Sequence, residues 1–209
     1  MGVVHNSRSL TLYARPGCPH AHRIRLILAE KGVAGYKSID VRDGNEDLAA
    51  VNPYNTLPTM VDRDLVVYDT RAIIEYIDER YPHPPLMPVD PVHRAQYRMA
   101  ICRFEADLYD PSDDMDRAPS TVRRARRKIQ EALVRLASDM PFGETVGAEY
   151  SILDCTLAPI LWRMDYYRLK LPTGQDRKLR DYARAIFRRE AFASSLSSFE
   201  MDMRPALAG

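Results

Sequence analysis

The pattern of apolar and polar residues divides this chain into a first part that mixes strands and helices and a second part that is helical. Residues 10–14 alternate apolar and polar positions and are rich in strand formers. A largely apolar stretch then predicts a buried helix that begins at Pro19 and ends before Gly32. Further strand-like and helical runs follow in the order 36–41, 46–50, 59–61, 65–68 and 70–77.

The second part begins after a proline-rich run. Asp90 can cap and Pro91 can open a long helix in which apolar residues recur every three or four positions, as expected of a buried stripe. The members of this stripe are Ala95, Met99, Cys102, Ala106 and Tyr109. Later helices are expected at 121–140, 152–164, 181–188 and 191–196.

The clearest helix start lies at Ser151. Its hydroxyl can cap the helix while Asp154 reaches back to the Ser151 amide, and Tyr150 and Cys155 stand where a hydrophobic staple forms. The helix that follows is apolar on nearly every face, so we expect it in the middle of the second domain. Pro159 should kink it, because proline removes one backbone donor.

The order β-α-β-α-β-β-α is the thioredoxin-like arrangement, so the predicted fold class is α/β plus all-α. We expect a thioredoxin-like domain over residues 1–82 and a proline-rich linker over 83–90. An all-helical domain should occupy residues 91–209.

Composition narrows the function classes. The 209 residues are 45% hydrophobic and carry a formal net charge of +1, which argues against autonomous nucleic-acid binding. No apolar run reaches the roughly 18 residues of a membrane span, and no signal peptide is recognisable at the start. The three cysteines and five histidines form no disulfide or metal pattern, so a reducing cytoplasm and no metal are expected.

Cys18 is the first candidate for chemistry. It precedes Pro19 at a predicted helix N-terminus, where the helix dipole and free amides favour a thiolate. Ala21 occupies the position of the second cysteine of a C-x-x-C pair, which excludes a dithiol mechanism. The alternative is that Cys18 is a small residue that merely fills this loop.

Two further segments can complete a binding cleft. A proline just before the third strand of a thioredoxin-like fold is cis and exposes the preceding backbone for pairing with a peptide such as glutathione, which points to Leu57 and Pro58. Asp69 and Thr70, at the start of the next helix, can hold the α-amino acid end of a γ-glutamyl group. The alternative for this pair is a plain helix cap.

These segments together resemble the glutathione transferase superfamily over nearly the whole chain. The stretches 29–33, 52–65, 75–92 and 153–164 narrow the resemblance to the bacterial stringent starvation protein A family. That resemblance implies a homodimer, or a heterodimer with a paralogue, that binds RNA polymerase holoenzyme near the housekeeping sigma factor. It also implies a stress-responsive transcription regulator that has kept the fold and lost transferase activity.

The proline run YPHPPLMPVDP can be a stiff spacer, because each proline ring restricts the backbone. The resemblance instead places the polymerase contact at Pro82, His83 and Pro84, with Pro85 beside them. Asp90 departs from the family, which can carry an aromatic residue there.

A rival reading remains at the first helix. Because of Cys18, the loop before the first helix resembles that of cysteine-type glutathione transferases more than that of the stringent starvation protein A family. The alternative function is therefore a glutathione transferase or a thiol reductase that uses Cys18. No cofactor is required for the first reading, whereas glutathione would bind in the second. Residues 123–128 form a basic run that is either a solvated helix face or a second contact surface for the polymerase or nucleic acid.

Overall fold

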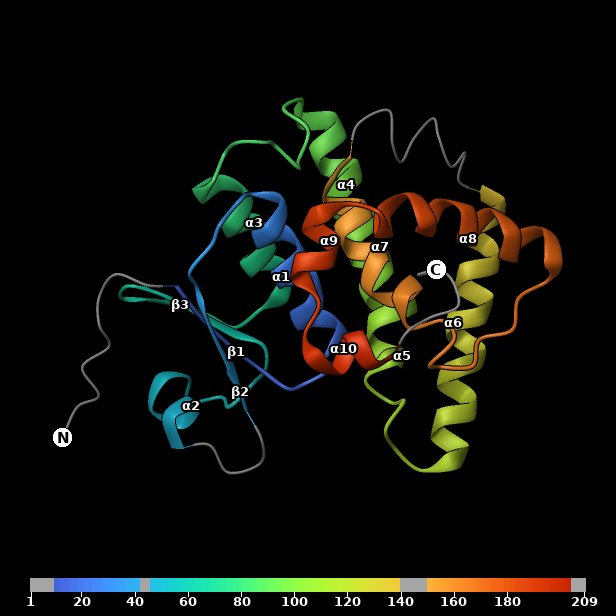
Figure 1. The fold of residues 1–209 in the computed structure, drawn as a ribbon, viewed down its shortest axis with the longest axis horizontal. Helices are drawn as coiled ribbons and strands as arrows, with labels where there is room; N and C mark the ends of the chain where they lie inside the picture. Colours follow the sequence, from blue (N-terminus) through green and yellow to red (C-terminus); the bar gives the residue numbers. More distant parts are fainter. Residues whose placement is uncertain (1–9, 42–45, 140–149, 204–209) are drawn as a thin grey trace.

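A mixed four-stranded sheet lies at one side of the molecule, and helices make up the rest (Figure 1). The computed structural model describes residues 10–41, 46–139 and 150–203. The strands are β1 (Thr11–Ala14), β2 (Lys37–Asp40), β3 (Thr59–Asp62) and β4 (Leu65–Val67). Their order in the sheet is β2-β1-β3-β4, with β1 and β2 parallel and the other pairs antiparallel. This is the thioredoxin-like topology that the sequence predicts.

Three helices belong to this first part. They are α1 (Pro19–Glu30), α2 (Glu46–Val51) and α3 (Thr70–Arg80). Helix α1 connects β1 and β2, because parallel strands cannot be joined by a tight turn. It contacts α3 and also two helices of the second part, α7 (Ile152–Trp162) and α9 (Glu190–Ser195). The apolar core therefore continues from the sheet into the helical part.

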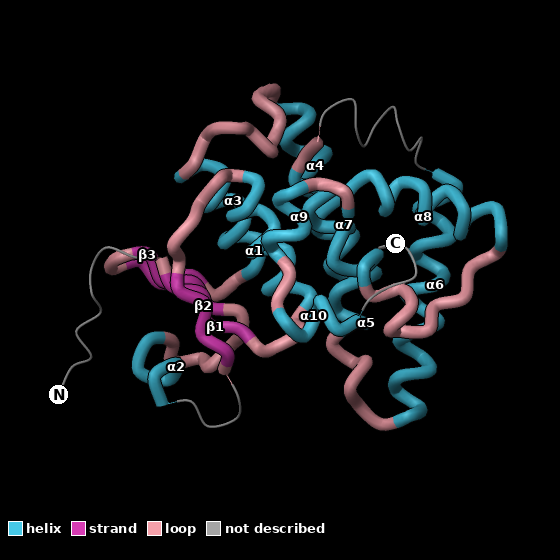
Figure 2. The backbone as a smooth tube through the Cα atoms, viewed as in Figure 1, coloured by secondary structure: helices cyan, strands magenta, loops and turns pink. Residues whose placement is uncertain are grey.

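Beyond α3 the described chain contains helices and loops alone (Figure 2). These elements are α4 (Pro91–Phe104), the π-helical turn η1 (Glu105–Tyr109), α5 (Asp110–Ser112), α6 (Pro119–Asp139), α7 (Ile152–Trp162), α8 (Thr173–Phe187), α9 (Glu190–Ser195) and α10 (Ser198–Met203). Helix α8 is longer than predicted, because its polar first turns precede a narrow apolar stripe of Leu179, Ala183 and Ile186. Helix α10 has no counterpart in the sequence prediction.

The predicted start of α7 is confirmed. The Ser151 amide donates to Asp154 Oδ2 at 2.7 Å, and Ser151 Oγ accepts from the Leu153 amide at 3.2 Å. Cys155 Sγ lies 3.6 Å from the Tyr150 hydroxyl, which places the two expected staple residues in contact. All residues of α7 are buried, so the most apolar helix does occupy the centre of the helical part.

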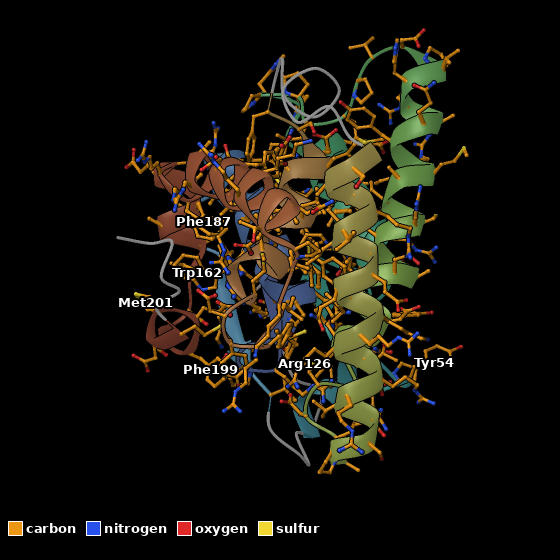
Figure 3. The ribbon with its side chains drawn as sticks, turned by 90° about the vertical axis from the view of Figure 1, so that its right-hand side faces the viewer. Tyr54, Arg126, Trp162, Phe187, Phe199 and Met201 are labelled. Carbon is orange, nitrogen blue, oxygen red and sulfur yellow. The ribbon has the colours of Figure 1, made fainter. Side chains whose placement is uncertain are left out.

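The prediction for α4 is wrong in one respect. Asp90 does cap the helix through the His93 amide at 2.9 Å, but four members of the predicted buried stripe are exposed. These are Ala95, Met99, Cys102 and Ala106. The core side of the helix is formed instead by Ile101 and Phe104. An apolar face of α4 thus points away from the molecule, and α4 lies along one edge of the view in Figure 3.

Candidate functional site

Cys18 is the N-terminal capping residue of α1, as predicted, but its environment does not favour a thiolate. The side chain is partly buried and packs against the main core. Burial raises the pKa of the thiol, and the opposing effect of the Ala21 and His20 amides is smaller. The expectation of a lowered pKa is therefore wrong, because desolvation outweighs the helix N-terminus.

The loop before Cys18 is covered by the last described helix. Arg163 Nη2 donates to the Gly17 carbonyl at 2.9 Å, and Arg163 Nε donates to the same oxygen at 3.3 Å. Gly17 has a φ of +73°, and a Cβ at this position would lie 2.5 Å from the ring of Phe199 on α10. The chain thus closes one side of the Cys18 loop with its own C-terminal segment.

A polar cluster lies on another side of α1. Arg23 is fully buried, donates to Glu105 Oε1 at 2.5 Å and stacks over the Tyr109 ring at 4.4 Å. His20 Nε2 lies 3.5 Å from Asp113 Oδ1. Nε and Nη1 of Arg23 have no acceptor among the described residues. Glu105 and Tyr109 come from the π-helical turn η1, so the irregular turn brings these groups onto α1.

The Leu57–Pro58 peptide bond is cis, as the thioredoxin-like pattern predicts. Pro58 is buried at the start of β3, and Leu57 is partly exposed. Asn52 stabilises this turn, because its buried side-chain amide donates a hydrogen bond from Nδ2 to Thr59 Oγ1 at 3.0 Å. An asparagine followed by proline is a common turn start, so its bridging role had no local signal.

Asp69 is committed to capping α3. Its Oδ1 accepts from the Arg71 amide at 2.8 Å and from the Ala72 amide at 3.2 Å. The hydrogen bond from the Arg71 side chain lowers the pKa of the Asp69 carboxyl and keeps it ionised. Asp69 thus acts as the N-terminal cap of α3, as the alternative interpretation predicts, and Thr70 beside it is partly exposed.

Asp69 and Thr70 do line a hollow of about 390 Å³ between the start of α3 and the end of α4. Its other lining residues are Arg71, Cys102, Glu105, Ala106 and Asp110. Two of the carboxylates in this lining are paired with arginines, Asp69 with Arg71 and Glu105 with Arg23. Cys18, Leu57 and Pro58 are not among its lining residues. The structure therefore places Asp69 and Thr70, the candidates for binding a γ-glutamyl group, beside the end of α4, in a hollow that Cys18 does not line.

The proline run presents a continuous exposed segment. Pro82, His83, Pro84 and Pro85 are all exposed, and the His83–Pro84 bond is cis. The next two residues turn inward, because Leu86 and Met87 are each only 4% exposed. The run is thus a surface fixed at one end by two apolar anchors.

The basic run on α6 is mainly a solvated face. Arg123, Arg124, Arg127 and Lys128 are exposed, whereas Arg126 turns back to donate to the Tyr167 carbonyl at 2.8 Å (Figure 3). No group of three or more potential metal ligands is found within residues 10–41, 46–139 and 150–203. None of the helices in these ranges is both long and apolar enough to cross a membrane.

Comparison with known proteins identifies relatives over most of the chain. The family model "Glutathione S-transferase, N-terminal domain" matches residues 12–85, and "Glutathione S-transferase, C-terminal domain" matches residues 119–189. A stringent starvation protein A homolog of Coxiella burnetii is 38% identical, with 93% of this chain and 95% of the relative covered. The homolog of Pasteurella multocida is 39% identical, with 91% and 92% covered.

Solved structures agree on the fold. The theta class glutathione S-transferase of Xanthomonas axonopodis pv. citri, solved with glutathione bound, superposes with a TM-score of 0.77 at 19% identity. The match covers 92% of this chain and 99% of that one. At this level of identity the match establishes the glutathione transferase fold alone.

Proposed function

We propose, from the finding that this chain belongs to the stringent starvation protein A family within the glutathione S-transferase superfamily, that it is a non-catalytic regulator of transcription. It acts in the cytoplasm under stress or starvation by direct contact with RNA polymerase holoenzyme, including the housekeeping sigma factor. The contact surface is Pro82–Pro85, which we call the docking surface.

The observation that carries this proposal is the exposure of four consecutive docking side chains on a fixed backbone. A flexible spacer would expose its prolines on a mobile chain, whereas here the following residues are buried in the core. Proline rings and an imidazole form an apolar surface with one polar group that can accept or donate a hydrogen bond. Because the backbone is already ordered, a partner that binds it pays little further conformational entropy.

We propose in addition that the chain forms a homodimer, or a heterodimer with a paralogue, through the exposed face of α4. Helical residues that repeat every three or four positions and are apolar normally face a core. In this chain the face is open, and Met99 is 73% exposed. Beside it, a groove of about 300 Å³ between α4 and α6 is lined mainly by apolar side chains, among them Phe104, Leu108 and Leu136. A second copy of the chain would cover this face, and a paralogue with a similar helix would do the same.

The test is the replacement of His83 and Pro84 together by alanine. We expect the double variant to fold and to self-associate like the wild type but to lose co-purification with RNA polymerase holoenzyme. The matched control is Pro53→Ala with His93→Ala, which removes the same side-chain types from exposed positions outside the docking surface. Equal polymerase binding by the wild type and a well-folded His83→Ala, Pro84→Ala variant would refute the docking surface.

The second candidate is a cysteine-type glutathione transferase or thiol reductase that uses Cys18. The observation in its favour is that Cys18 lies at the N-terminus of α1, near the amides of His20 and Ala21, in a transferase fold. Its cleft would include the Leu57 backbone and the hollow at Asp69 and Thr70. Calorimetry with millimolar glutathione, together with thiol-transfer assays of wild type and Cys18→Ser, decides this candidate. Absence of both binding and transfer eliminates it.

A further inference from the structure

A buried ion pair, Lys31 with Asp78, binds the backbone of the docking surface and of the two residues that follow it. Asp78 Oδ1 accepts from the Leu86 amide at 2.9 Å, and Asp78 Oδ2 accepts from the Met87 amide at 3.3 Å. Lys31 Nζ lies 2.6 Å from Asp78 Oδ1 and donates to the Pro84 carbonyl at 2.5 Å. One carboxylate and one ammonium group therefore bind three backbone groups of the segment that carries the docking surface.

This ion pair is well shielded from solvent. The side chain of Lys31 is 0% exposed, and that of Asp78 is 8% exposed. Each ion has the other as its counter-charge and backbone groups as further partners, as buried ions require. The arrangement is thus a complete network rather than a surface contact of small energetic value.

The segment Pro84–Met87 is bound to three helices, to two of them through this pair. Lys31 directly follows α1 and donates its amide to the Ile27 carbonyl at 3.0 Å. Asp78 belongs to the last turns of α3. On the opposite side, the Leu86 carbonyl accepts from the amide of Ile152, the first residue of α7, at 3.0 Å. The segment is therefore fixed to α1, α3 and α7 within a few residues.

We propose that Lys31 and Asp78 are positioning residues for partner binding, an inference that rests on the proposed function of the docking surface. Neither side chain would touch the partner. Their role is to keep the backbone of Pro84–Met87 in one conformation. The exposed proline rings and the His83 imidazole then face the partner in a fixed spatial arrangement. Fixing each backbone residue costs roughly 1–2 kcal/mol of conformational entropy, and here that cost is met during folding.

The chemistry of the pair indicates which substitutions loosen the segment. In Asp78→Asn one acceptor oxygen becomes an NH₂ donor, which cannot bind a backbone amide. Lys31→Met keeps an apolar stem but removes the ammonium group that holds the Pro84 carbonyl. Lys31→Arg keeps a cation but brings a larger, planar guanidinium group into a site with no exposed surface, so Lys31→Met is the variant to measure and should weaken polymerase binding.

The experiment measures the affinity of purified RNA polymerase holoenzyme for the immobilised full-length protein in a double-mutant cycle. We expect Asp78→Asn to weaken binding about tenfold, because disorder returns to roughly one or two backbone residues. The second arm of the cycle is His83→Ala alone, which should weaken binding without abolishing it. Added to His83→Ala, Asp78→Asn should cause less further loss than in the wild type, because one of the side chains that it positions is already absent. Glu79→Gln, which changes an exposed acid next to Asp78, is the matched control and should bind like the wild type.

A purely stabilising role predicts a different pattern. The loss from Asp78→Asn would then add to that of the docking variant, or polymerase binding would be unchanged while the protein became less stable. Either result, or wild-type binding by Lys31→Met, overturns the inference while leaving the docking surface in place. If the wild type itself does not bind the holoenzyme, the proposed function fails, and this inference fails with it.

Amide hydrogen exchange supplies the independent readout. Protection of the Leu86 and Met87 amides should fall in Asp78→Asn, and that of the Ile152 amide, which donates to Leu86, should fall with them, while protection in the middle of α7 stays at the wild-type level. Unchanged protection at both amides would show that the carboxylate does not hold the segment, and would also overturn the inference.

Discussion

Glu200 Oε1 lies 2.5 Å from Nη2 of Arg163, and neither side chain has any exposed surface. The pair binds α10 to the end of α7, and Arg25 of α1 contacts the same carboxylate. Arg163 Nη1 also donates to His22 Nδ1 at 3.1 Å, so His22 carries its proton on Nε2 and is neutral. The C-terminal helix that covers the Cys18 loop is thus held by buried charge.

Glu200→Gln should destabilise the protein strongly. The substitution leaves Arg25 and Arg163 without a counter-charge in a buried site, at a cost of about 3–5 kcal/mol in the free energy of unfolding. Urea denaturation measures this loss. Glu190→Gln, at an exposed position of α9, is the control and should change stability by less than about 0.5 kcal/mol. Similar small effects of both variants would show that the network contributes little.

Stability should fall at acid pH because of the same cluster. Burial lowers the pKa of His22. Burial acts to raise the pKa of Glu200, but the positive charges of Arg25 and Arg163 outweigh it and lower that pKa overall. Both groups bind protons more readily in the unfolded chain, so stability is lost as pH falls, first below about 6.5 and then below about 4.3.

Unfolding free energies measured across this pH range test the prediction. Each proton taken up on unfolding contributes about 1.4 kcal/mol per pH unit. Glu200→Gln should show a shallower decline than the wild type below about pH 4.3, where only the wild type can protonate this side chain. Parallel curves for the two proteins would contradict the assignment to Glu200.

Cys18 should react slowly at neutral pH. With Cys102→Ser and Cys155→Ala in place, Cys18 is the remaining thiol, and burial raises its pKa above the ordinary value of about 8.5 to 9. The rate of alkylation by iodoacetamide should therefore rise with pH to a midpoint above that range. The same protein in urea should give an ordinary midpoint. A midpoint below about pH 7 would restore the thiolate expected of a cysteine-type transferase.

Met99→Glu should prevent self-association through α4. The substitution places a charge on the exposed apolar face, and burying it in an interface without a partner is costly. Light scattering should give the mass of a dimer for the wild type and of a monomer for the variant. Met201→Glu alters a methionine that is also exposed, 53% on α10, and should stay dimeric. A dimeric Met99→Glu protein would place the interface elsewhere.

Local structure could be predicted from the sequence wherever the donor and the acceptor of a hydrogen bond lie within a few residues of each other. The caps at Asp69, Asp90 and Ser151 each join groups two or three residues apart, so the sequence pattern contains the whole interaction. The same holds for the succession of strands and helices and for the wholly buried α7, whose apolar character leaves it no solvent-facing side.

Only the tertiary structure decided the features that depend on distant segments. Glu200 meets Arg25 across 175 residues, and the thiol of Cys18 is desolvated by packing that no local pattern describes. The sequence by itself determined that α4 has an apolar face, but the packed chain decided that this face points outward. Helical periodicity shows which residues lie on the same face of a helix. Which way that face points depends on how the other helices and strands pack against the core.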